Sequence, residues 1–121
     1  LHYQLPPCAQ GKLVSVMKGK VWDVAVDIRK DSKTFGQWVG VELSEENNLS
    51  FYIPPGFAHG FSVLSEEAHF FYKCTSEYSK LHERGLRFDD NDLNIDWKVS
   101  NPIISSKDEE YPGIKDIETF E

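Results

Sequence analysis

Cysteine is scarce in this sequence, which has 121 residues but only two cysteines, Cys8 and Cys74. Neither belongs to a Cys-x-x-Cys pair, and two cysteines do not make a disulfide framework. Their scarcity argues against a disulfide-stapled fold, a zinc ribbon and thioredoxin chemistry. We expect two reduced, partly buried thiols, which suits a cytoplasmic protein.

The sequence also lacks an excess of positive charge and long apolar runs. Its 13 Lys and Arg against 20 Asp and Glu give a net charge of −7, whereas non-specific nucleic-acid binding needs a basic surface. No apolar stretch approaches the roughly 20 residues of a membrane-spanning helix, and no signal peptide is visible. We therefore expect a cytoplasmic protein with neither nucleic acid nor a membrane among its partners.

Aromatic residues and period-2 alternation are abundant. Eight Phe, five Tyr and three Trp favour a sheet-rich core. In Val21–Ile28, one face carries Trp22, Val24, Val26 and Ile28. Similar patterns predict strands at Leu1–Gln4, Lys12–Met17, Gln37–Leu43, Leu49–Ile53, Phe61–Leu64 and His69–Thr75. Many short strands without a long helical pattern predict an all-β antiparallel sandwich or barrel.

Turn residues separate these strands. Lys18-Gly19-Lys20 predicts a hairpin turn, and Pro54-Pro55-Gly56 predicts a sharp corner. The acidic tail Ser105–Glu121 is expected to hold one short helix at most. Without a repeat or a linker, residues 1–121 are expected to form a single domain. Because the sequence begins with Leu1, inside a predicted strand, we expect its N-terminal portion to be missing.

The four histidines are not spaced as metal ligands. His2, His59, His69 and His82 are far apart in the sequence, and none forms the His-x-His pair that places two ligands on one strand. The metal-binding cupin signature, in which Glu follows such a pair, is absent as well. We therefore expect no metal.

The residues alone leave two interpretations open for most candidate site positions. His2, in a predicted strand, is by default a packing or surface residue. His59, which follows the Pro-Pro-Gly corner, is either an exposed turn residue or a histidine held rigidly at a barrel mouth. Asp108, beside the acidic tail, resembles an ordinary surface charge.

Lys12 and Tyr72 each interrupt an apolar strand face. Lys12 is expected on the face of Val14 and Val16, where a cation is costly unless it neutralises an oxyanion or reaches water at the strand end. Tyr72 is expected on the face of Phe70, where core packing is the default interpretation. If Tyr72 points inward, its hydroxyl needs a partner.

A series of ordered motifs from Leu1 to about Asp108 resembles the dTDP-4-dehydrorhamnose 3,5-epimerase family. The motifs are Leu-His-Tyr-Gln, Gln-Gly-Lys-Leu-Val, Phe-Gly-Gln-Trp-Val-Gly-Val-Glu-Leu, Ile-Pro-Pro-Gly-Phe-Ala-His-Gly-Phe, Tyr-Lys-Cys-Thr, His-Glu-Arg-Gly-Leu-Arg-Phe-Asp-Asp, Ile-Asp-Trp and Ser-Lys-Asp. The resemblance implies a cupin-type double-stranded β-helix, or jelly-roll barrel, and a homodimer. It also implies a substrate, a dTDP-4-keto-6-deoxy sugar epimerised at C3 and C5, and no cofactor, neither metal nor nicotinamide.

The resemblance also implies roles for individual residues. The catalytic positions are His2 as general base, Tyr72 as general acid and Asp108 as the carboxylate that orients His2. The substrate-binding positions are Lys12 at the developing enolate oxygen, His59, Tyr78 stacked on the nucleotide base, Glu83 and Lys107.

The family has a further N-terminal stretch, with an Arg before the Leu-His pair and a Gln-x-Asn segment, that is not in this sequence. Two alternatives therefore stay open. Beside the 3,5-epimerase, the first alternative is a related 3- or 5-epimerase or ketoisomerase of a dTDP-4-keto sugar. The second, which the absent stretch motivates, is a truncated barrel that only binds the nucleotide sugar.

Overall fold

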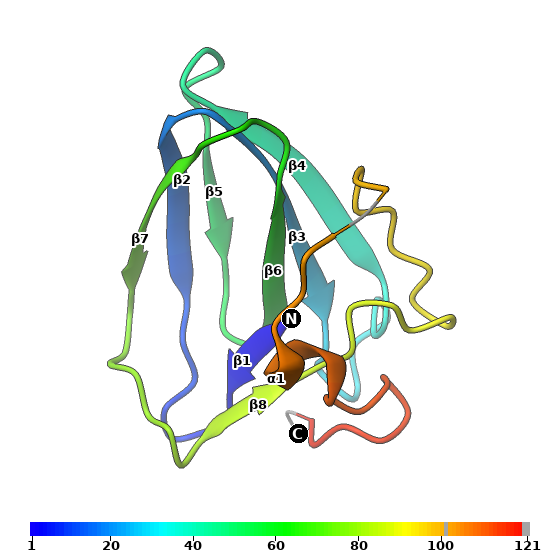
Figure 1. Ribbon diagram of the computed structural model, residues 1–121. Helices are drawn as coiled ribbons and strands as arrows, with labels where there is room; N and C mark the ends of the chain where they lie inside the picture. Colours follow the sequence, from blue (N-terminus) through cyan, green and yellow to red (C-terminus); the bar gives the residue numbers. More distant parts are fainter. Residues whose placement is uncertain (101, 120–121) are drawn as a thin grey trace.

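The computed structural model describes residues 1–100 and 102–119, and these residues form two antiparallel sheets (Figure 1). The larger sheet has the strand order β4-β3-β6-β1-β8, and the smaller one has the order β5-β2-β7. The strands are β1 (His2–Gln4), β2 (Lys12–Lys18), β3 (Lys20–Asp27), β4 (Trp38–Ser44), β5 (Ser50–Ile53), β6 (Phe57–Val63), β7 (His69–Cys74) and β8 (Glu83–Gly85). The all-β prediction is confirmed.

The predicted strands are present, with two differences. The strand predicted at Phe61–Leu64 is β6, which begins at Phe57 and therefore includes His59. The three-residue strand β8 was not predicted, because so short a segment shows no readable alternation. The predicted turn at Gly19 joins β2 to β3, with a φ of 83° that glycine adopts readily. The tail holds one short helix, α1 (Ser106–Glu109), and its last two residues lie outside the described residues.

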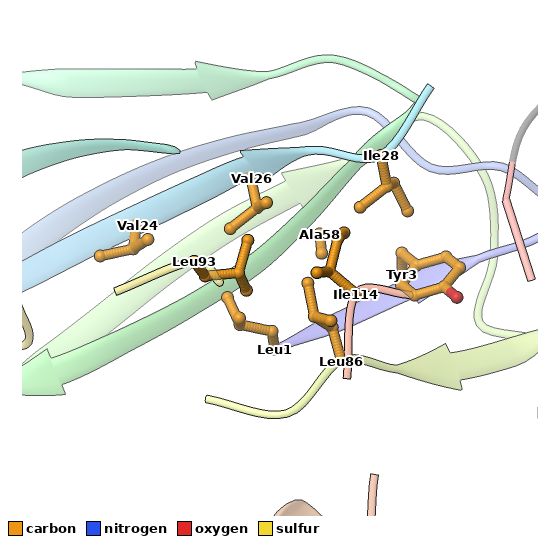
Figure 2. Packing of buried hydrophobic residues seen from close by; sticks show 9 residues of the cluster. All are labelled: Leu1, Tyr3, Val24, Val26, Ile28, Ala58, Leu86, Leu93 and Ile114. Carbon is orange, nitrogen blue, oxygen red and sulfur yellow. The ribbon is translucent and has the colours of Figure 1, made fainter. Parts of the chain in front are cut away.

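Two apolar clusters lie on opposite faces of the larger sheet. The cluster on its outer face joins β1, β3 and β6 to the chain after β8 (Figure 2) and consists of Leu1, Tyr3, Val24, Val26, Ile28, Ala58, Leu86, Leu93 and Ile114. The cluster between the sheets consists of Val14, Val16, Val21, Ala25, Leu43 and Ile53. Both faces of β3 are thus buried, and the C-terminal segment is the cover of the outer face.

Alternation along β1 and β2 turns polar residues toward the space between the sheets. Leu1 and Tyr3 pack in the outer cluster, so His2 and Gln4 take the opposite face. On β2, Val14 is buried in the inner cluster. Lys12 lies two residues earlier and shares that face, as predicted.

Asp27 closes the end of β3 with a network of hydrogen bonds. Its carboxylate accepts from the guanidinium of Arg29 at 3.0 and 2.9 Å, from the hydroxyl of Ser32 at 2.6 Å and from the hydroxyl of Thr34. Burial alone would raise the pKa of Asp27, but these hydrogen bonds outweigh it and hold the pKa well below its usual 3.8. The network is structural, since Asp27 lines neither of the cavities described below.

Asp27→Asn is expected to lower the free energy of unfolding by about 1–3 kcal/mol at pH 7, because it disrupts a buried network. The lowered pKa means that this contribution is complete above the unfolded-state pKa, declines below it, and is lost as the pH falls through the lower folded-state pKa. Urea unfolding at pH 7 and pH 3 should therefore show that wild type and variant differ less in free energy of unfolding at pH 3 than at pH 7. Asp31→Asn, in the exposed part of the same loop, is the control. An equal difference at both pH values would contradict this assignment.

No helix in the described part of the chain is long and apolar enough to cross a membrane.

Candidate active site

Two adjoining cavities of about 700 and 600 Å³ open between the sheets. His2, Lys12 and Tyr72 line both of them. The first cavity also contains His59 and Asp108, and the second contains Tyr78 and Glu83. Seven of the eight predicted site residues therefore line one continuous space. Lys107, the eighth, reaches it by an ion pair with Glu83.

His2 and Asp108 form a pair across 106 residues of sequence. Nε2 of His2 lies 2.7 Å from Oδ1 of Asp108. Helix α1 positions the carboxylate, because its N-cap residue Ser105 accepts from the Asp108 backbone N–H and donates to Oδ2 at 2.8 Å. Burial would raise the pKa of Asp108, but the bonds from Ser105 and His2 outweigh it, and the pKa is lowered.

This pairing determines the tautomer of His2. An ionised carboxylate only accepts hydrogen bonds, so Nε2–H must donate to Asp108, and the lone pair lies on Nδ1. Burial lowers the pKa of His2, and the Asp108 carboxylate only partly opposes that effect. The imidazole is therefore neutral near pH 7, with Nδ1 able to accept a proton.

A second histidine–carboxylate pair lies deeper in the barrel. Nε2 of His59 is 2.8 and 3.0 Å from the two oxygens of Asp23, and both side chains are almost fully buried. Burial raises the pKa of Asp23, while the hydrogen bond from His59 and the charge of Lys12 act against it. Of the two interpretations of His59, the exposed turn residue is wrong, because His59 lies inside β6.

Sequence reasoning missed Asp23 as a site residue. The signal was present, because Asp23 stands among apolar residues in the middle of the strand Val21–Ile28. A carboxylate at an interior position of a central strand needs a buried partner. The alternation did not reveal that this partner was His59.

Lys12 and Tyr72 lie on neighbouring strands of the smaller sheet. Burial lowers the pKa of Lys12, and the nearby acidic residues Asp23 and Glu83 oppose that effect. Tyr72 is opposite Val14 in the β2–β7 register and faces the cavities, with its side chain about half exposed there (56%). The default interpretation of Tyr72 as a core-packing residue is therefore wrong.

Aromatic side chains form much of the first cavity's wall. Phe61 and Phe70 stack with their ring centroids 4.4 Å apart, and Phe70 also stacks on His59 at 6.2 Å. Trp97 is held at the rim by its indole N–H, which donates to the Phe88 carbonyl at 2.8 Å. This wall is apolar, so charges that develop inside it are poorly screened.

The second cavity has polar walls that Gln4 holds together. The buried Gln4 amide donates to the carbonyls of Cys8 at 2.7 Å and Glu77 at 3.2 Å, and it accepts from the Ser79 backbone N–H at 2.8 Å. These bonds fix the chain on both sides of Tyr78, which is 63% exposed and points its ring at solvent-accessible space. The arrangement presents a flat aromatic surface at the cavity edge.

Glu83 lines the same cavity as Tyr78, and Lys107 pairs with Glu83. The Lys107 ammonium contacts the Glu83 carboxylate, which raises the lysine pKa. The Lys107 side chain is 59% exposed, so it is accessible to solvent.

The cysteines are free, as predicted. Cys8 is half-buried, but Cys74 is exposed, so the prediction of a partly buried thiol is wrong for Cys74. Its position at the end of β7 puts it on the open second cavity. Within the ranges 1–100 and 102–119, no group of three or more His, Cys, Asp or Glu side chains is arranged to hold a metal ion.

Comparisons with known proteins agree with this geometry. A family model described as dTDP-4-dehydrorhamnose 3,5-epimerase matches residues 1–116. The protein of that name from Shigella flexneri is 61% identical over 108 residues, which cover 89% of this chain and 60% of the relative.

Two crystal structures are also close in fold. The dTDP-4-dehydrorhamnose 3,5-epimerase of Elizabethkingia anophelis aligns with a TM-score of 0.94 and 55% identity, over 96% of this chain and 64% of that one. The Legionella pneumophila dTDP-6-deoxy-D-glucose-3,5-epimerase, solved with dTDP-4-keto-L-rhamnose, aligns with a TM-score of 0.92 and 52% identity, over 98% and 63% of the chains. This likeness confirms the predicted cupin-type fold. The chain spans less than two thirds of each of these three relatives.

Proposed function

Because the chain belongs to the dTDP-4-dehydrorhamnose 3,5-epimerase family, we propose that it inverts C3 and C5 of dTDP-4-dehydro-6-deoxy-D-glucose, giving dTDP-4-dehydro-L-rhamnose. One observation carries the proposal. A neutral histidine paired with a carboxylate, and a tyrosine on the other sheet, line the same cavity.

The chemistry of the substrate explains why these groups suffice. C3 and C5 both flank the C4 ketone, so removal of either proton gives an enolate whose negative charge collects on the C4 oxygen. Lys12 and His59 line the first cavity and stabilise that oxygen. The apolar wall strengthens this stabilisation and excludes water from the enolate.

Inversion requires a proton to leave one face of the sugar and another to arrive on the opposite face. His2 lies on β1 of the larger sheet and Tyr72 on β7 of the smaller one, so the two groups approach a bound sugar from different walls. In our proposal Nδ1 of His2 takes the proton and the Tyr72 hydroxyl supplies the other. Asp108 holds His2 in the required tautomer.

The second cavity is proposed as the nucleotide subsite. The exposed ring of Tyr78 provides a stacking surface for the base, and Lys107 provides positive charge for the diphosphate. Glu83 orients Lys107. Two free cysteines fit the cytoplasmic location that we also propose.

Asp23→Asn tests the role given to His59. The variant keeps the size of the side chain but removes the carboxylate that orients the imidazole, so proton exchange is expected to slow by about 10-fold or more. Affinity for dTDP should stay unchanged, because Asp23 lies away from the second cavity. Asp31→Asn is again the control, and normal exchange in Asp23→Asn would remove His59 from the mechanism.

We further propose a homodimer through the outer face of the smaller sheet. Leu13, Tyr52 and Phe71 are 44%, 54% and 50% exposed on the three strands of that sheet. Leu13 and Tyr52 are register partners, and Phe71 is opposite Ser15, two residues from Leu13 on the same face of β2. Exposed apolar surface of this kind is typical of an interface, and a second copy of the same face would cover it.

Phe71→Glu is expected to shift the dimer to monomer, because burying two unpaired carboxylates at the interface is costly. Sedimentation velocity measures the change. Glu67→Gln, at an exposed turn position, is the control. A Phe71→Glu dimer as stable as wild type would place the interface elsewhere.

Calorimetry with dTDP, run beside a turnover assay on the dTDP-sugar, tests the function itself. Binding with turnover supports the epimerase, and binding without turnover supports a module that only holds the nucleotide sugar. The number of inverted carbons in the product separates the 3,5-epimerase from a 3- or 5-epimerase, and a moved ketone would identify a ketoisomerase.

A further inference from the structure

Tyr111 packs against His2 although the chemistry proposed above does not use it. The Tyr111 and His2 ring centroids are 5.4 Å apart, and the ring planes are nearly perpendicular, at 88°. Edge-to-face contacts at this distance are favourable and directional. The ring therefore restricts the plane of the imidazole.

A glycine makes this contact possible. Gly85 is the register partner of His2 in the β1–β8 pair. A Cβ on Gly85 would lie only 2.2 Å from ring atoms of Tyr111. The missing side chain opens the slot beside His2 that the tyrosine ring fills.

The ring of Tyr111, rather than its hydroxyl, makes the contact. The hydroxyl oxygen is buried and interacts with the ammonium of Lys107. Burial raises the pKa of this hydroxyl, and the charge of Lys107 opposes the shift. The ring contact with His2 does not involve this hydroxyl, so phenylalanine should occupy the same slot.

We propose that Tyr111 is a positioning residue for the general base. Its ring holds the His2 imidazole in the plane that keeps Nε2 on Asp108 and turns Nδ1 toward the sugar. This inference rests on the proposed function, since it assigns His2 as the base. Small misplacement of a catalytic group can lower a rate by about 100-fold.

The surroundings of His2 predict how its titration should respond. The charged side chains that face it are Asp108 from α1 and Glu83 from β8. Tyr111 adds no charge but excludes water. Removing the ring admits water, so the lowered pKa of His2 should rise toward its ordinary 6.5. The acid limb of the pH–rate profile should move to higher pH with it.

Tyr111→Leu and Tyr111→Phe test the proposal as a matched pair. Tyr111→Leu should lower the rate of deuterium exchange into the dTDP-sugar by about 10- to 100-fold, while leaving dTDP affinity unchanged. Tyr111→Phe should exchange at the wild-type rate. Nitrogen NMR of the His2 ring should show the Nε2–H tautomer in wild type and Tyr111→Phe, and mixed tautomers in Tyr111→Leu.

Gly85→Ala should also remove the Tyr111 ring from His2, because the new methyl group would displace that ring. Its effects on the His2 pKa and on exchange should resemble those of Tyr111→Leu, and the double variant should be no worse than either single one. Amide NMR spectra establish that each variant is folded.

Two results would overturn the proposal: a Tyr111→Leu protein with the wild-type His2 tautomer and pKa, or a Tyr111→Phe protein as impaired as Tyr111→Leu. The His2 measurements need no substrate. A wild-type protein that exchanges no protons would therefore contradict the proposed function, while the NMR comparison would still decide whether Tyr111 orients His2.

Discussion

His2→Ala is expected to abolish measurable proton exchange at both C3 and C5. Loss of a general acid–base group typically lowers the rate by about 10²–10⁴-fold, and here the same imidazole serves both carbons. Exchange would be followed by proton NMR of the dTDP-sugar in deuterated water. Affinity for dTDP should change little, because the proposed nucleotide subsite depends on Tyr78 and Lys107.

His69→Ala is the control for this variant. His69 lies on β7, is 58% exposed and pairs with Glu67 at the surface, outside both cavities. It should exchange at the wild-type rate. Near-normal exchange in His2→Ala would show that another group is the base.

The pH dependence of exchange follows from the His2 environment. The His2 imidazole can accept a proton only when it is neutral. Activity is therefore present above the pKa of His2 and falls as the pH drops through that pKa. Because burial lowers this pKa from 6.5, the acid limb should lie below pH 6.5.

Tyr72→Phe is expected to separate exchange from inversion. His2 would still remove the proton, and Lys12 would still hold the enolate, but the far face of the sugar would lack its donor. The variant should therefore incorporate deuterium from the solvent into the substrate, because the enolate is reprotonated on the face that lost the proton. Little inverted product should form. The ring remains, so stability should change by only about 1 kcal/mol.

Tyr52→Phe, on the outer face of the smaller sheet, is the control for the lost hydroxyl. It should exchange and invert normally. If Tyr72→Phe inverts at the wild-type rate, Tyr72 is a wall residue, and some other acid serves the second face.

The alternation of apolar and polar residues predicted the strands and the faces on which their side chains lie, because these depend on residues close together in the sequence. The strand at Val21–Ile28 was readable because Val24, Val26 and Ile28 repeat at every second position and fill one cluster. The same rule placed Lys12 on the face of Val14. Each of these features depends on a few consecutive side chains.

Contacts between distant residues were not predictable from local patterns. Asp108 looked like a surface charge because its partner, His2, lies 106 positions away, and the family resemblance alone connected the two. Asp23 and His59 are 36 positions apart and became a pair only when β3 and β6 aligned. Nothing in the local sequence pointed to Tyr111 as a partner of His2, since that contact depends on the space that Gly85 leaves beside His2.

A count of the protons that the chain exchanges tests the proposed 3,5-epimerase activity most directly. The protein is incubated with dTDP-4-dehydro-6-deoxy-D-glucose in deuterated water, and proton NMR of the sugar is recorded over time. The C3 and C5 signals are both expected to disappear, and the product is expected to have the L-rhamno configuration. A sugar nucleotide that calorimetry shows to be bound, but that keeps its protons at C3 and C5, would contradict that activity.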